Sequence, residues 1–173
     1  MTRVESILKD PAFLKNITEN QVREADRKFC GHSFQHLVDV ARIAYILMLE
    51  SGEIKRFMAE HDINHKSAKE LIYASALLHD IGRWKEYETG IDHAMAGAEL
   101  AIDLLQKARF KDKEITLITT GIREHRRKTK GMSVLGGVLY RADKLSRLCC
   151  RCSAKDECYK INEMETGYKP LVY

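Results

Sequence analysis

The chain has 173 residues, of which 45% are hydrophobic and 31% are charged, and its formal net charge is +4. These values are typical of one globular domain that buries a core. They exclude a membrane-spanning protein, because no segment approaches the run of about 18–20 apolar residues that a membrane helix needs. The mild positive charge suits an anionic substrate but does not indicate nucleic-acid binding. The opening residues, MTRVESILKDP, lack the apolar core of a secretory signal, so we expect a cytoplasmic protein.

Proline is almost absent from the chain, since Pro11 and Pro170 are the only two prolines. Proline interrupts helices, so the long stretch between them can be largely helical. Apolar residues recur there at spacings of three and four, as on the buried face of a helix. The sequence therefore predicts an all-α fold, with helices at residues 17–29, 36–50, 67–81, 93–108, 113–128 and 132–148 and a polar, exposed stretch at 53–65.

Several residues predict where these helices begin and end. Thr18 and Ser67 are each followed three residues later by Gln or Glu, which indicates a capping box at the start of a helix. Asp92 is expected to cap the helix that follows it. Gly82 is expected to end the apolar helix that carries the sequence YASALLHDIG, because glycine is favoured just after a helix C-terminus.

Six ionisable residues lie in line with the apolar, inward-facing positions of these helices. Carboxylates are almost never fully buried unless they are paired or bound to a metal ion. Mutual hydrogen bonds alone can hardly satisfy four histidines and two aspartates, whereas helical bundles do hold metal ions between facing side chains. We therefore expect a metal site formed by His36, His79, Asp80, His93, His125 and Asp143.

The other histidines fit this centre less well. His32 lies one helical turn before His36, and we expect it to support a ligand or contact a substrate rather than bind the metal. His61 and His65 have a spacing of four that can chelate a metal on a helix, but they lie in the polar stretch, so we expect surface residues. The basic run REHRRKTK at residues 123–130 is interpreted as an exposed helix end and loop rather than a nucleic-acid-binding surface.

The residues around these positions resemble the HD domain superfamily of metal-dependent phosphohydrolases. HSFQHLVDV, ALLHDIGR and RADKLS match the family's first histidine, its His-Asp doublet and its last aspartate. IDHAMAGAE and IREH resemble the two additional histidine positions of members that bind two metals. The resemblance implies a bundle of about six or seven helices in a single domain at residues 1–173, with a core at about 29–148 and a cysteine-bearing tail at 149–173.

The resemblance also implies a ligand set. His36, His79, Asp80 and Asp143 would hold a first metal ion. Asp80, His93 and His125 would hold a second, with Asp80 bridging the two. Imidazole and carboxylate together do not select one divalent metal; iron or manganese is favoured for a binuclear site, and zinc, nickel and magnesium remain open.

The activity that this ligand set implies is attack of a metal-activated water on a phosphate monoester or diester, with a nucleotide as the commonest substrate. His79 and Asp80 would be central, and Arg83 and Lys144 are the expected phosphate-binding cations. Two alternatives stay open: a di-iron oxygenase that uses the same six positions, and a regulatory module that binds nucleotides without turnover. A homodimer is also compatible with the sequence.

The cysteines are not explained by the resemblance. The chain has five, and four of them are crowded into residues 149–158. Disulfides are not expected in a cytoplasmic protein, so metal binding or free thiols are the better interpretations. If the helices of His36 and Asp143 run antiparallel, the cysteines six residues from each extend toward the same end of the bundle. The sequence therefore predicts a structural zinc or iron–sulfur site at Cys30, Cys149, Cys152 and Cys158.

Overall fold

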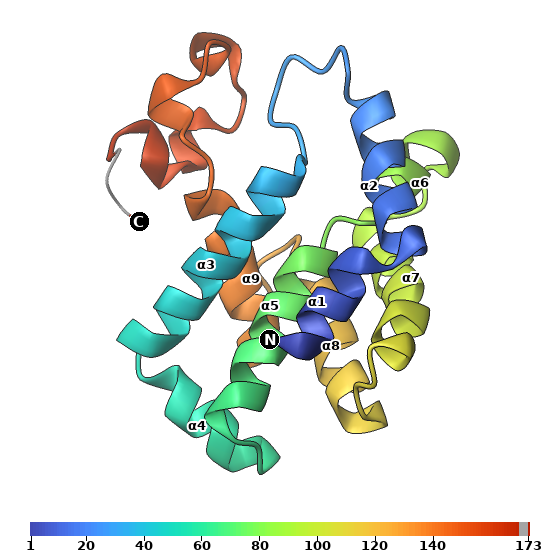
Figure 1. Ribbon diagram of the computed structural model, residues 1–173. Helices are drawn as coiled ribbons and strands as arrows, with labels where there is room; N and C mark the ends of the chain where they lie inside the picture. Colours follow the sequence, from blue (N-terminus) through green and yellow to red (C-terminus); the bar gives the residue numbers. More distant parts are fainter. Residues whose placement is uncertain (170–172) are drawn as a thin grey trace.

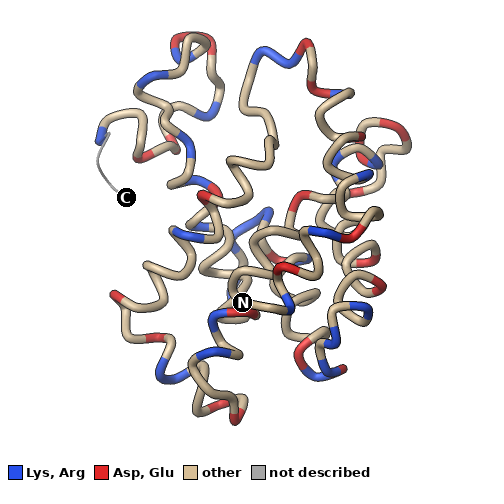
Figure 2. Tube along the Cα trace, viewed as in Figure 1, with Lys and Arg blue, Asp and Glu red and all other residues tan. Residues whose placement is uncertain are grey.

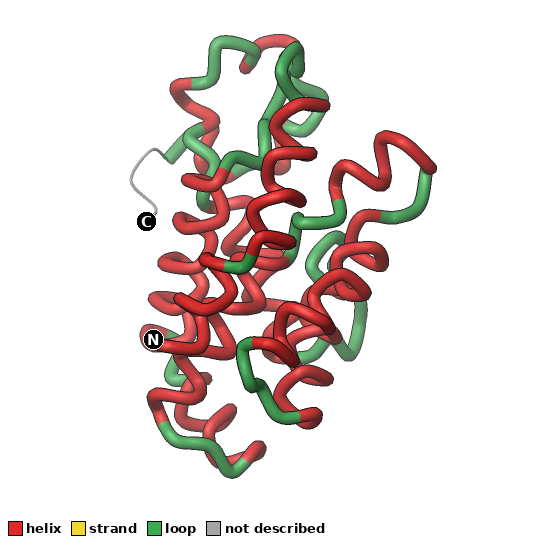
Figure 3. Tube along the Cα trace, turned by 45° about the vertical axis from the view of Figure 1, so that its right-hand side comes forward, coloured by secondary structure: helices red, strands yellow, loops and turns green. Residues whose placement is uncertain are grey.

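The computed structural model of the protein describes residues 1–169 and 173, and it confirms the all-α prediction (Figures 1 and 3). This part of the chain contains no strand. Its helices are α1 (Thr2–Lys9), α2 (Pro11–Arg23), α3 (Phe34–Glu50), α4 (Glu53–His61), α5 (His65–Leu78), α6 (Arg83–Thr89), α7 (His93–Lys107), α8 (Asp112–Glu124) and α9 (Val134–Leu145). The short helices α1, α4 and α6 lie outside the six helical segments predicted from the sequence.

Helix α5 lies in the middle of the bundle and is buried along most of its length (Figure 1). It packs against α3 and α8, while α9 packs on α3 and α8, and α7 covers the outer side of α8. Leu71, Ile72 and Leu78 of α5 are fully buried in this core. The helix with the most buried residues is therefore surrounded by helices, and its C-terminal end meets the ends of four others: α3, α7, α8 and α9.

Side-chain caps account for most of the helix starts, but not always those predicted. The Asp92 carboxylate accepts from Ala94 N–H, so the predicted cap of α7 is confirmed. The prediction at Thr18 was wrong, because Asp10 caps α2 with Pro11 in its first turn, and the Thr18 hydroxyl donates to Leu14 O. The prediction at Ser67 was also wrong: the earlier Asn64 is the cap of α5 and accepts from Ser67 N–H.

Gly82 is needed for close approach of two segments, not to end the apolar helix as was predicted. Its φ is −90°, and it begins α6 rather than ending α5, which stops at Leu78. A Cβ atom at Gly82 would lie 2.4 Å from Gly97 N and 2.7 Å from His93 O. The turn at residues 79–82 therefore packs directly against the first turns of α7.

Three other predicted segments are corrected by the structure. Helix α2 ends at Arg23, and residues 24–33 form a loop instead of continuing the helix to residue 29. The stretch at 53–65 is not wholly exposed, because Ile54 and Phe57 of α4 are buried in the core. Helix α8 ends at Glu124, so the basic run beyond it is an exposed loop as predicted, apart from the buried His125.

The cysteine-bearing tail consists of four short 3-10 turns, at Cys149–Arg151, Lys155–Glu157, Ile161–Glu163 and Glu165–Gly167. It lies at the same end of the bundle as the 24–33 loop, at the top of Figure 1. Lys28 Nζ donates to Glu157 Oε2 at 2.5 Å, and the rings of Phe29 and Tyr159 meet edge to face. Loop and tail therefore contact each other although they are more than 120 residues apart in the chain.

Charged residues of both signs are interspersed along the whole trace (Figure 2). None of the described helices is long and apolar enough to cross a membrane.

Candidate metal centre

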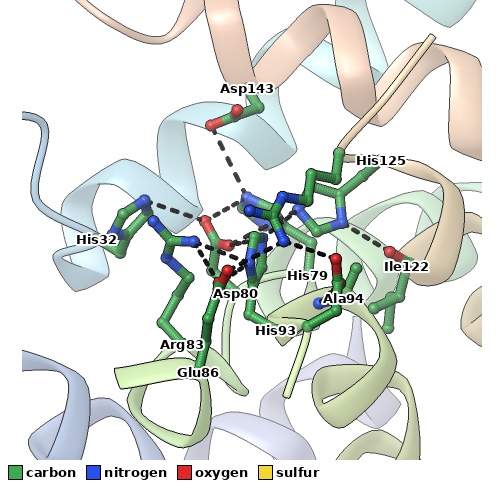
Figure 4. Close-up of polar contacts among 12 residues, drawn as sticks. His32, His79, Asp80, Arg83, Glu86, His93, Ala94, Ile122, His125 and Asp143 are labelled. Atoms are coloured by element: carbon green, nitrogen blue, oxygen red, sulfur yellow. Dashed lines mark hydrogen bonds and ion pairs between the residues drawn. The ribbon is translucent and has the colours of Figure 1, made fainter. Parts of the chain in front are cut away.

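Six ionisable side chains from five helices or helix ends meet at the middle of the bundle, and all of them except His36 are labelled in Figure 4. His36 comes from the first turn of α3 and Asp143 from the last turn of α9, while His93 is the first residue of α7. The other three follow helix ends: His79 and Asp80 directly after α5, and His125 directly after α8. All are buried except Asp143, whose side chain is 30% exposed.

The first group contains two histidines and two aspartates. His79 Nε2 lies 2.8 Å from Asp80 Oδ2, and His36 Nε2 lies 3.1 Å from Asp143 Oδ1. His36 Nε2 is 3.7 Å from Asp80 Oδ2. One ligand atom from each of the four residues lies within 4.8 Å of all the others, so a single ion between them could contact all four.

The second group shares Asp80 with the first. Asp80 Oδ1 lies 3.4 Å from His93 Nε2 and 3.7 Å from His125 Nε2, and the two histidine nitrogens are 3.3 Å apart. The carboxylate of Asp80 therefore presents Oδ2 to one group and Oδ1 to the other. This is the arrangement that a carboxylate bridging two adjacent ions requires.

The histidines in these groups are oriented through their other ring nitrogen. Nδ1 of His79 donates to Ala76 O, and Nδ1 of His125 donates to Ile122 O, both at 2.6 Å. Nδ1 of His93 contacts the carboxylate of Glu86. A histidine that donates from Nδ1 keeps the lone pair on Nε2, the nitrogen that faces the centre here.

His79 shows most directly that these residues fit a metal ion. Its side chain is 0% exposed, and its Nε2 has no hydrogen-bond partner among the described residues, although Asp80 lies close to it. Leaving a buried polar atom without a partner costs about 1–3 kcal/mol. A bound cation would remove that cost, because the free lone pair would then coordinate it.

The electrostatics of the centre also favour a cation. Burial acts to raise the pKa of Asp80, but His79 and His32 outweigh it, so that this pKa lies well below its ordinary value. Burial acts to lower the pKa of His79, but Asp80 and Asp143 raise it to about 10, so without an ion these carboxylates favour a proton on this imidazole, and a bound metal would take the place of that proton. Burial, with Arg83 and His125, lowers the pKa of His93 to about 4, which leaves a neutral imidazole able to bind a metal at pH 7.

His32 lies beside the first group without belonging to it. Its Nε2 is 3.8 Å from Asp80 Oδ2, and its Nδ1 is 2.5 Å from Glu24 Oε1. The sequence alone did not reveal Glu24, because it lies eight residues earlier in the predicted helix rather than at an obvious spacing. His61 and His65 lie far from the centre, where they contact Phe57 and Tyr45.

The centre opens into a cavity of about 410 Å³. Both predicted cations, Arg83 and Lys144, line it. Arg83 Nη1 lies 2.8 Å from both Glu86 Oε2 and His93 Nδ1, and Lys144 Nζ donates to Tyr140 OH at 2.8 Å. The cavity has four further basic side chains that sequence reasoning missed: Arg27, Arg126, Arg147 and Lys160.

Among these four basic residues, Arg147 makes direct contacts with two residues of the first group. Its Nη2 lies 2.9 Å from His36 Nε2 and 3.2 Å from Asp143 Oδ1, and its Nη1 donates to Gly31 O. One lone pair of His36 cannot accept this hydrogen bond and bind an ion at the same time. An ion in the first group would therefore have to displace Nη2 from His36. The four-residue spacing from Asp143, one helical turn, was the signal that could have identified Arg147.

Comparison with known proteins agrees with this geometry. A family model of the HD domain matches residues 33–148. The chain belongs to the HD domain family. HD domains are generally metal-dependent hydrolases, and the buried His and Asp groups support binding of a divalent metal here. An uncharacterized protein of Clostridium beijerinckii is 40% identical over 159 residues, which cover 91% of this chain and 92% of that protein. No solved structure matches the chain.

Proposed function

We propose that this HD domain protein hydrolyses a small phosphate monoester or diester, with a nucleotide as its substrate class. The proposal rests on the position of the metal-binding groups beside a basic cavity. The two His and Asp groups, which share Asp80, open into a single cavity lined by six arginine and lysine side chains. Phosphate esters are anionic, so a cavity with this charge attracts and orients them.

In the proposed reaction, the chain's own residues hold and orient the reacting groups. His36, His79, Asp80 and Asp143 would hold one ion, and Asp80 with the two remaining histidines would hold another. Divalent metal bound here would supply hydroxide near neutral pH and would polarise a phosphoryl oxygen. The Nδ1 hydrogen bonds keep the imidazoles in the tautomer that binds metal, and burial keeps bulk water away from them.

The basic side chains would bind the substrate. Arg83 is positioned by Glu86 beside the second group, and Arg147 lies beside the first, so a phosphate between them would contact a guanidinium from either side. Guanidinium groups suit this role because they bind phosphate through two parallel hydrogen bonds. The cavity is also lined by three aromatic rings that could stack on a base, which supports a nucleotide substrate. They are Tyr87, Tyr140 and Tyr159.

The test is a phosphatase screen of the full chain with Mn²⁺, Fe²⁺, Zn²⁺ or Mg²⁺ added separately. Nucleoside monophosphates, cyclic dinucleotides and sugar phosphates cover the two ester classes. We expect phosphate or nucleotide release with at least one metal. Asp80→Ala should abolish both activity and metal binding, because this residue serves both groups. Asp103→Ala, on the exposed side of α7, should match the wild type.

A hydrolase has to be distinguished from the oxygenase and regulatory alternatives. A protein that binds metal but cleaves no phosphate ester under any condition would contradict the proposal. Oxygen consumption by the iron-loaded protein, under the same conditions, would favour a di-iron oxygenase. Tight nucleotide binding without turnover would favour a regulatory module.

A further inference from the structure

Four of the five cysteines line one cavity that the His and Asp centre does not explain. The cavity has a volume of about 300 Å³, and Phe29, Leu148 and Ile161 contribute apolar walls. Its thiols come from two distant segments: one from the 24–33 loop and three from the first turns of the tail. All of them are free thiols, and they are Cys30, Cys149, Cys152 and Cys158.

The backbone brings the three tail cysteines to this cavity by short turns. Cys149 begins the first 3-10 turn, and Cys152 follows it with its N–H bonded to Cys149 O. Cys158 follows the second turn in the same way, and at both Cys152 and Cys158 the backbone becomes extended. Each of these two turns is therefore followed directly by a cysteine, so Cys152 and Cys158 are separated along the chain by one turn.

The fourth thiol is brought in by contacts of the 24–33 loop. Arg147, two residues before Cys149, donates to Gly31 O next to Cys30. Burial and the neighbouring thiols of Cys30, Cys152 and Cys158 raise the pKa of Cys149. A bound cation would favour the thiolate forms that this crowding disfavours.

The tail also lacks a core large enough to order it. Within residues 149–169 the buried residues are Cys149, Ala154, Met164, Thr166 and Gly167. Its 3-10 turns of three residues each are too short to be stable alone. Segments with so little apolar burial are usually held by a disulfide or a metal. Because the thiols are free in this structure, they do not form a disulfide, and a metal is the remaining explanation.

The spacing of the sulfurs favours an iron–sulfur cluster over a single zinc ion. Four thiolates at about 2.3 Å from one tetrahedral zinc ion would lie about 3.8 Å from one another. Among the described residues, the His and Asp groups do come within 4.8 Å of one another, but no three of the cysteine sulfurs do. A cluster distributes its four cysteine ligands over several iron atoms, so its ligands lie farther apart than those of one zinc ion.

We propose that Cys30, Cys149, Cys152 and Cys158 bind an iron–sulfur cluster that fastens the tail to the 24–33 loop. This site goes beyond the proposed hydrolysis and does not depend on it. Cys30, Cys149 and Cys158 also line the cavity of the His and Asp centre, together with Tyr159 and Lys160 of the tail. The cluster therefore holds one wall of that cavity in place.

The test uses the full chain purified without oxygen. Iron, zinc and acid-labile sulfide are measured per chain, together with the visible absorption of the protein. Sulfide decides the question, because ions held by imidazole and carboxylate contribute none. We expect sulfide in the wild type, with at least as much iron as sulfide because the His and Asp centre can hold further iron, and loss of nearly all the sulfide in Cys152→Ser. The matched control is Cys150→Ser, since Cys150 lines neither cavity, and it should keep the wild-type sulfide content.

Further measurements separate this site from the central one and from a folding defect. Asp80→Ala should lose metal from the His and Asp centre but keep its sulfide. Proteolysis of Cys152→Ser should cut the tail while leaving the bundle intact. If Cys152→Ser does not fold, the sulfide content of the wild type decides whether a cluster is present. Wild-type protein that contains zinc but no sulfide would overturn the proposal, and so would wild-type protein that contains neither zinc nor sulfide.

Discussion

At the scale of single residues, the doublet His79-Asp80 works because it follows a helix end. Adjacent residues on a helix point about 100° apart, so they could not both face one ion in mid-helix. Helix α5 stops at Leu78, and the turn at residues 79–82 brings the two side chains together, with His79 Nε2 2.8 Å from Asp80 Oδ2. The position of the helix end therefore decides the geometry of the doublet.

Glu86 is expected to matter for metal binding although it is not placed to bind the ion. Its carboxylate contacts His93 Nδ1 and so fixes which nitrogen faces the centre. Loss of such a partner typically weakens metal affinity by about 10–100-fold. We expect this loss for Mn²⁺ binding to Glu86→Ala, measured by titration calorimetry, with partial recovery in Glu86→Gln, which retains an accepting oxygen. Glu60→Ala, an exposed pair partner of Arg56, is the control. Equal affinities in Glu86→Ala and the wild type would contradict this role.

At the scale of the helices, the site depends on how closely the ends pack. The 79–82 turn touches the start of α7, where only glycine fits at position 82 because of Gly97 N and His93 O. The same contact places His93 beside Asp80. Packing of two helix ends, rather than either helix alone, therefore positions the second group.

Gly82→Ala tests this contact. The added methyl group would overlap backbone atoms that cannot rotate away, so we expect a loss of about 1–3 kcal/mol in the free energy of unfolding, measured with urea. Gly137→Ala is the matched control, because it lies inside α9 with nothing within 4 Å of the added Cβ. Removing a helical glycine should stabilise the protein by about 0.5–1 kcal/mol. The same sign of change in both variants would contradict the packing argument.

The 24–33 loop is held to α6 by Glu24, and this should make stability depend on pH. Burial acts to raise the pKa of Glu24, but hydrogen bonds from His32 and Tyr87 lower it from 4.5 to about 2. A carboxyl with a lowered folded pKa stabilises the fold above pH 4.5 and loses that contribution as the pH falls toward 2.

Glu24→Gln should therefore reduce the free energy of unfolding by about 1–3 kcal/mol at pH 7. The difference from the wild type should shrink between pH 4.5 and 2, as followed by urea unfolding across that range. Glu60→Gln, an exposed residue, should show no such trend. A difference that is constant over the whole range would show that the ionised form of Glu24 is not what stabilises the loop.

At the scale of the whole molecule, distant segments are tied together by charged side chains. Arg3 of α1 pairs with Glu70 of α5 at 2.7 Å and with Glu114 of α8 at 2.6 Å. Both carboxylates are buried, and the guanidinium also stacks on Phe110. Helix α1, which the sequence did not predict, is thereby fastened to the core helices.

Removing Arg3 should destabilise the protein as a whole. Arg3→Met would leave two buried carboxylates without their cation, which we expect to cost about 2–3 kcal/mol, less than for a fully buried pair because Arg3 is partly exposed. Urea unfolding measures the loss. Arg56→Met, which removes an exposed arginine of α4, should change stability by less than about 0.5 kcal/mol. A small effect at Arg3 would show that water replaces the arginine at the two carboxylates.

The sequence predicted the main helices and the inward histidines and aspartates because both follow from local periodicity. Apolar spacing identified α3, α5, α7, α8 and α9, and the same spacing showed which ionisable residues share their inner faces. Prediction from the sequence failed where a feature depends on residues that are distant along the chain. Asp10 and Asn64 compete as caps with Thr18 and Ser67, and the choice depends on how far each helix can extend before it meets its neighbours.

The sequence by itself therefore determined that the protein is an all-α HD domain with six inward ionisable residues. Only the tertiary structure decided that the two oxygens of Asp80 face different groups and that Arg147 approaches the first group. The sequence predicted that the four cysteines meet at one end of the bundle, and the structure adds that they line one cavity there. The physical reason is distance along the chain. Periodicity reports which face of a helix is buried, whereas the meeting of helix ends and loops depends on packing between segments that are far apart in sequence.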